Sequence, residues 1–115
     1  MNLAQIIEKL NLKVLTDGGK DFSQMTPSGG YASDLLSCVI AGAKQQNIWV
    51  TLQAHSNIVA VAALLDLCAI VITENAIPDD ETTQKAREEN IIILLTPEPT
   101  FSIVGKLWEL GIKNG

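Results

Sequence analysis

Three short apolar segments, which begin roughly 21 residues apart, constrain the fold of this chain more than any other feature. They are rich in β-branched side chains and show no polar alternation, which is typical of strands buried on both faces. The three segments are 48–52, 69–73 and 91–95. Each precedes a segment with helical features, and these are 56–67, 78–89 and 99–110. Because tandem strand–helix units form right-handed crossovers, the sequence predicts an α/β fold with a mainly parallel sheet.

The expected helices differ in how much of their surface is apolar. Apolar residues at the i, i+3, i+4 and i+7 positions predict an amphipathic helix over 3–10, with Asn2 as its N-cap. Residues 58–65 are apolar all round, so this helix is expected at the centre of the molecule. Residues 79–89 are mostly polar, so their helix is expected at the periphery.

The first half of the chain also holds a less regular region. The alternating segment 12–16 predicts a short edge strand. Residues 17–30 contain four glycines and a proline, which predict a loop. A helix is expected over 35–44, with Ser33 as its N-cap and Asp34 in its first turn.

Composition narrows the class of protein. The chain has 115 residues, which suits a single domain over 1–115. It carries 8 Lys plus Arg against 13 Asp plus Glu, and aromatic residues make up 4%. Because phosphate neutralisation needs the opposite balance, nucleic acid is not expected as a partner. Without a basic N-terminal region or an apolar run of membrane-spanning length, we expect a cytoplasmic protein that binds no membrane. Cys38 and Cys68 lie in apolar segments and are expected to be buried free thiols.

Polar clusters follow the three central strands, at the edge where ligands bind in open parallel sheets. The chain's single histidine lies there, before a helix whose N-terminal amides could hold an anion. These residues predict a site for a small anionic metabolite or a nucleotide: Gln53, His55, Ser56, Asn57, Thr73 and Glu74. The alternative is that Ser56 and Asn57 only cap the helix, while Gln53 and His55 bond to neighbouring loops. Gly29 and Gly30 could likewise bring backbone close to a phosphate, or could simply form a turn.

Several chemistries find no support in the residues present. Neither Gly19-Lys20 nor Gly105-Lys106 lies in a P-loop pattern. The two cysteines lack the spacing of a zinc site, and no nucleophile elbow accompanies His55. We therefore predict no catalytic residues, no metal and no cofactor.

The segment from Asp21 to Leu36, with Met25-Thr26 and Gly29-Gly30-Tyr31-Ala32-Ser33-Asp34, resembles the motif of the DRTGG domain family. The resemblance continues through residues 48–62 and ends with 107–112, so the chain looks like a stand-alone DRTGG protein. It departs from the motif at Ser23, about where the family has an arginine, and at the extra residues Pro27-Ser28.

This resemblance implies a three-layer α/β sandwich similar to the N-terminal domain of HPr kinase/phosphorylase. It also implies a regulatory module, because DRTGG domains accompany catalytic domains that lie elsewhere in the chain. The leading hypothesis is a non-catalytic sensor that binds a small anionic ligand and modulates a partner enzyme.

Two other hypotheses remain open. One is a structural module that docks a partner or self-associates as a homodimer, without a small ligand. Its docking stripe would be Trp108, Leu107, Leu110 and Ile112, unless these side chains simply cover the sheet. The other is an enzyme of unrecognised chemistry, for which one imidazole and one arginine leave few catalytic groups.

Overall fold

A five-stranded sheet, in the order β1-β5-β4-β3-β2, organises the computed structural model of residues 1–115. Strand β1 runs antiparallel to β5, and the other neighbours are parallel. The strands are β1 (Lys13–Asp17), β2 (Gly29–Ala32), β3 (Asn47–Thr51), β4 (Ala69–Ile72) and β5 (Ile92–Leu95). The helices are α1 (Leu3–Leu10), α2 (Leu36–Gly42), α3 (Asn57–Leu65), α4 (Asp80–Glu88) and α5 (Thr100–Glu109), with a 3-10 turn η1 (Phe22–Gln24). This confirms the α/β fold with a mainly parallel sheet.

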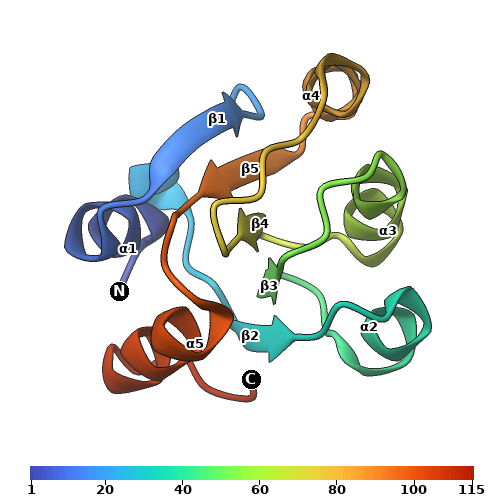
Figure 1. The fold of residues 1–115 in the computed structure, drawn as a ribbon. Coiled ribbons are helices and arrows are strands. Elements are labelled where there is room, and N and C mark those ends of the chain that lie inside the picture. Colours follow the sequence, from blue (N-terminus) through green and yellow to red (C-terminus); the bar gives the residue numbers. More distant parts are fainter.

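Helices cover both faces of the sheet, which makes the fold a three-layer sandwich, as the resemblance implied. Figure 1 shows α1 and α5 on one face and α2, α3 and α4 on the other. In β3, Ile48 and Val50 belong to the apolar cluster under α1 and α5, whereas Trp49 belongs to the cluster under the other three helices. Because both faces need apolar side chains, the central strands show no polar alternation.

Strand β2 was not predicted, and its first two residues lie in the segment 17–30 that was expected to form a loop. It is short, begins with two glycines and occupies the edge of the sheet beside β3. Its pairing with β3, from Gly29 opposite Asn47 to Ala32 opposite Val50, supplies the stabilisation that its own composition lacks.

Two expected helix features are also corrected. Helix α2 begins at Leu36, and the hydroxyl of Ser33 accepts from the amide of Leu35 instead of capping the helix. Helix α3 does not lie at the centre of the molecule: it covers the sheet from outside, and the side chain of Leu64 is 70% exposed. An outer-layer helix always has one side toward solvent, even when its sequence is apolar all round.

Other local predictions are confirmed in whole or in part. Asn2 caps α1 in a capping box with Gln5, and the mostly polar α4 lies at the periphery of the second face. Both cysteines are free, but only Cys68 is buried, whereas Cys38 is exposed on α2. None of the helices is long and apolar enough to cross a membrane.

Candidate functional site

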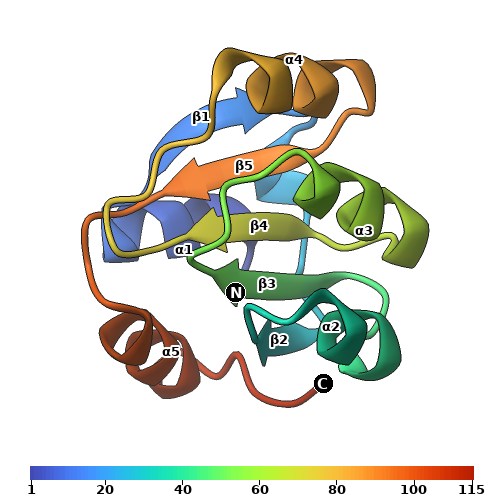
Figure 2. The ribbon, with the colours of Figure 1, turned by 45° about the vertical axis from the view of Figure 1, so that its right-hand side comes forward.

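The loops after the four parallel strands meet at one edge of the sheet, here called the carboxyl edge. Figure 2 shows β2, β3, β4 and β5 pointing toward this edge, where the connections to α3, α4 and α5 begin. The structure brings six of the predicted site residues to this edge: Gln53, His55, Ser56, Asn57, Thr73 and Glu74.

Thr73 and Glu74 are engaged by the start of α5. The hydroxyl groups of Thr73 and Thr100 lie 2.5 Å apart, and the Glu74 carboxylate accepts from the amide of Thr100 at 2.7 Å. Pro99, the residue before α5, provides no side-chain cap, so Glu74 caps this helix from a different loop. The helix N-terminus therefore already interacts with an anion of the protein itself.

Gln53 forms a hydrogen bond with Asp34, a residue that was predicted to lie in the first turn of a helix. One oxygen of Asp34 accepts from the hydroxyl of Thr51 and from the amide of Leu52, both at 2.8 Å. The Gln53 side chain donates to the Asp34 carbonyl at 3.1 Å. Asp34 thus joins the ends of β2 and β3, and it was missed because β2 was not recognised as a strand.

Residues 55–57, at the start of α3, form no side-chain hydrogen bonds. Ser56 has helical backbone angles and no capping bond, and His55 and Asn57 are exposed. The first amides of the helix donate to nearby carbonyls: Ile58 to His55 and Val59 to Ser56, both at 3.1 Å. Ser56 therefore occupies the N-cap position that the alternative interpretation gave it, but neither its side chain nor that of Asn57 forms a capping hydrogen bond.

Most charges at the carboxyl edge are negative. The carboxylates of Asp34, Glu74, Asp79 and Glu98 lie in its loops. Hydrogen bonds from the amide and the hydroxyl of Thr82 lower the pKa of Asp79, and His55 adds a smaller lowering. This acidic balance disfavours an anionic ligand at the carboxyl edge.

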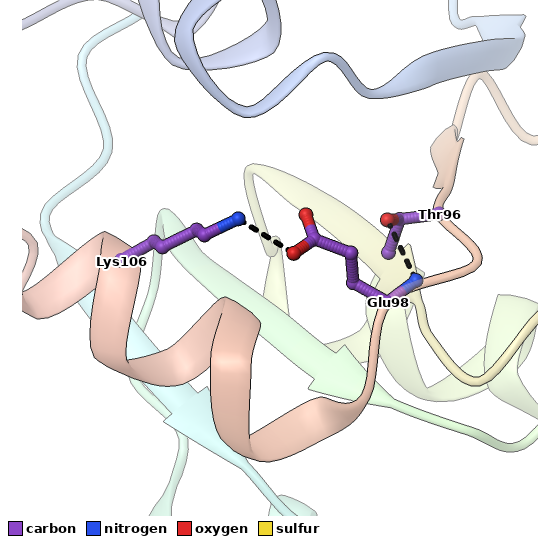
Figure 3. Close-up of polar contacts among 3 residues, drawn as sticks. All are labelled: Thr96, Glu98 and Lys106. Atoms are coloured by element: carbon purple, nitrogen blue, oxygen red, sulfur yellow. Dashed lines mark hydrogen bonds and ion pairs between the residues drawn. The ribbon is translucent and has the colours of Figure 1, made fainter.

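The β5–α5 loop holds the one ion pair of the structure. Lys106 lies 2.5 Å from a carboxylate oxygen of Glu98, whose amide donates to the hydroxyl of Thr96 at 3.2 Å (Figure 3). Lys106 is the single cation of α5, and this pair engages it with a carboxylate of the protein itself.

Gly29 and Gly30 lie at the opposite end of the sheet from the other predicted residues. Gly29 pairs with Asn47, the first residue of β3. An added Cβ at Gly29 would lie 2.6 Å from backbone atoms of Lys113 and Gly115, and the amide of Gly30 donates to the Lys113 carbonyl at 2.7 Å. The glycine pair therefore makes room for the segment after α5, and the two residues do not join the carboxyl-edge cluster.

A hollow of about 270 Å³ opens between β2 and α5, and we call it the β2–α5 groove. Its walls are apolar side chains, the edge of β2 and the segment after α5. The lining residues are Gly30, Tyr31, Ala32, Val50, Val104, Leu107, Trp108, Ile112, Lys113 and Asn114. The side chain of Trp108 is 47% exposed, whereas Leu107 and Ile112 are buried against the sheet. Of the predicted docking stripe, Trp108 is therefore the member that most clearly faces solvent.

Lys113 is the one charged residue among those that line the groove. Its amine lies 5.3 Å from the centre of the Trp108 ring and forms no ion pair. Sequence reasoning missed this site because its parts come from an unrecognised strand, a helix and a terminal segment. No group of three or more His, Cys, Asp or Glu residues is arranged to hold a metal ion.

The sheet order and the two helical layers define a three-layer α/β domain in which one face of the edge strand is left open. No family model and no curated protein matches the sequence. Among solved structures, the chain is similar to the CBS and DRTGG domains of the regulatory region of Clostridium perfringens pyrophosphatase, complexed with its activator diadenosine tetraphosphate. The TM-score is 0.74 at 16% identity, over 98% of this chain and 46% of that chain. The two proteins share a fold, and this chain spans about half the length of the solved one.

Proposed function

We propose that this chain is a DRTGG-type regulatory domain without catalytic activity, which binds a small anionic ligand and thereby modulates a partner enzyme. The proposal is supported by the whole-chain likeness to a structure from the regulatory region of an enzyme. It is also supported by the motif resemblance at residues 21–36 and by the chain's few catalytic residue types.

One observation carries the proposal: Lys113 provides an unpaired cation beside an apolar groove. An apolar pocket with a single charged group is typical of sites that bind small molecules, because the charge orients a ligand that the walls desolvate. The positive charge selects an anion. The groove therefore suits the anionic ligand better than the acidic carboxyl edge does.

Isothermal titration calorimetry of the whole chain, against a panel of nucleotides and sugar phosphates, tests this function. We expect saturable heat with at least one compound, and a rise in the melting temperature with the same compound, because a ligand that binds only the folded state stabilises it. If no compound in the panel gives heat or raises the melting temperature, the proposed function is wrong.

The alternative function is an interaction module that self-associates. Four large apolar side chains are exposed after the four parallel strands, and Phe101 is 91% exposed. The four residues are Leu35, Leu52, Ile77 and Phe101. Large apolar side chains that are exposed at one edge of a domain can take part in protein–protein contacts.

Sedimentation equilibrium over a wide concentration range separates the two functions. Self-association that is abolished by Phe101→Glu would favour the interaction module, and Trp108→Glu tests the helix stripe in the same way. A monomer at every concentration, in the wild type and both variants, would contradict it.

A further inference from the structure

The walls of the β2–α5 groove narrow the chemistry of the ligand, and this step rests on the proposed function. One wall is the half-exposed ring of Trp108, with Val104 and Leu107 from the same helix beside it. A planar apolar surface of this kind is best covered by another ring, since aromatic pairs gain energy beyond the burial of their area. The wall therefore favours an aromatic ligand over an aliphatic one.

The second wall is the free side of the edge strand. In a parallel pair of strands, every second residue directs its backbone N–H and C=O toward the neighbouring strand. Just after β2, the amide of Ser33 donates to the Val50 carbonyl of β3, so Ser33 and Tyr31 are the residues that face β3. Gly30 and Ala32 consequently direct their backbone groups away from β3. The Gly30 amide is used by Lys113, which leaves the Gly30 carbonyl and the Ala32 amide as an adjacent acceptor and donor. Such a pair matches the edge of a nitrogen heterocycle that offers one donor and one acceptor.

The third element is the amine of Lys113 at the rim. The amine lies over the Trp108 ring, 5.3 Å from its centre, so a base that stacks on this ring takes the place of the amine, which can then turn toward the anionic group beside the base. A phosphate is a strong acceptor for an ammonium group, and the bond is charge-assisted. The volume of about 270 Å³ is slightly below the range of drug-sized sites, which leaves room for one base with its sugar.

We infer that the β2–α5 groove binds a nucleoside monophosphate, with the base between Trp108 and the edge of β2 and the phosphate at Lys113. The base pairs with the Gly30 carbonyl and the Ala32 amide. The carboxyl edge takes no part in this binding.

Tryptophan fluorescence reports on the groove directly, because Trp108 lines it and Trp49 is fully buried under the other helical layer. We expect AMP to change the emission of the whole chain in a saturable way. Trp108→Phe should remove the fluorescence change while calorimetry still detects AMP binding, because the ring wall is kept.

Lys113→Gln tests the phosphate contact, and Lys85→Gln on α4 is the matched control because it removes an equal charge from the opposite face. We expect Lys113→Gln to weaken AMP binding about tenfold, which is typical for one charge-assisted contact. Adenosine binding should be unchanged in both variants. Phenyl phosphate, which has a ring and a phosphate but no heterocycle edge, should bind at least about tenfold more weakly than AMP.

Each result has a distinct meaning. AMP binding that is equal in wild type and Lys113→Gln, or phenyl phosphate binding as tight as that of AMP, would overturn this inference. Inorganic phosphate that competes as well as AMP would also overturn it, because the base would then contribute nothing. Heat from a sugar phosphate of the panel, without binding of AMP or any other nucleoside monophosphate, would overturn the inference and leave the proposed function standing.

Discussion

The amide of Gly30 donates a hydrogen bond to the carbonyl of Lys113 at 2.7 Å, which joins the edge strand β2 to the segment after α5. Figure 2 shows this segment running from α5 back along β2. The contact closes one end of the β2–α5 groove and holds the backbone of Lys113 near the edge of the sheet. Both the predicted ligand contact and part of the domain's stability depend on it.

Replacing Gly29 by alanine should displace this segment. The new Cβ would lie 2.6 Å from backbone atoms of Gly115 and Lys113, which side-chain motion cannot relieve. We expect a loss of roughly 1–3 kcal/mol in the free energy of unfolding, measured by urea denaturation. Gly30→Ala is the control, because its Cβ would have ordinary contacts at 3.6 Å, and its effect should stay within about 0.5 kcal/mol. Equal effects of the two substitutions would contradict the close packing of Gly29 against Lys113 and Gly115.

Asp34→Ala should destabilise the domain more than removal of an unbonded surface carboxylate. The substitution leaves the buried hydroxyl of Thr51 and the amide of Leu52 without their acceptor. The expected loss is about 1–3 kcal/mol by chemical denaturation. Glu8→Ala on α1, an exposed carboxylate with no side-chain hydrogen bond, serves for comparison and should change stability little. If both variants unfold at the same urea concentration, Asp34 does not join β2 to β3 in solution.

The ion pair between Glu98 and Lys106 should contribute little to stability despite its short distance. The two side chains are 33% and 48% exposed, so water and salt screen their attraction. A double-mutant cycle with Glu98→Gln and Lys106→Gln should give a coupling energy below about 1 kcal/mol. The coupling energy should decrease further in about 1 M salt, because salt screens the attraction between exposed charges. A larger coupling that salt does not change would show that this pair is shielded from solvent.

The two cysteines should differ sharply in reactivity. Cys38 is exposed, whereas burial raises the pKa of the Cys68 thiol to about 11, with a small opposite effect from Lys20. Because the thiolate is the reactive form, a disulfide reagent at neutral pH should modify one thiol of the native chain rapidly and the second only after unfolding. Cys38→Ser should abolish the rapid phase. A rapid phase that persists in this variant would show that Cys68 is accessible.

The same buried thiol should make stability depend on alkaline pH. In the unfolded chain Cys68 loses its proton near its ordinary pKa of 9.0, while in the folded chain it keeps the proton to about 11. The folded state binds more protons between these values, so its stability falls as pH rises through this window. The contribution of Cys68 to the loss is up to roughly 2–3 kcal/mol. Urea denaturation at pH 8 and pH 10.5 should show that the free energy of unfolding falls less for Cys68→Ala than for the wild type. Equal falls in the two proteins would show that Cys68 does not cause this pH dependence.

Much of the fold follows from the sequence alone, because local patterns decide it. The apolar segments that became β3, β4 and β5 need two buried faces, and only a sheet covered on both sides provides them. Helix boundaries are equally local: Asn2 caps the start of α1, and Gly111, with its positive φ, lies just after the end of α5.

What the tertiary structure decided involves contacts between residues that are distant in the sequence. β2 exists because β3 and the segment at Lys113 pair with its two sides, although two glycines make its own strand propensity low. At the carboxyl edge, the sequence placed Thr73 and Glu74 correctly but did not show that the start of α5 engages them. The groove is made of an edge strand, a helix face and a returning segment, so no single pattern encodes it. Periodicity and capping depend on neighbours along the chain, whereas a binding surface depends on which segments the folded sheet brings together.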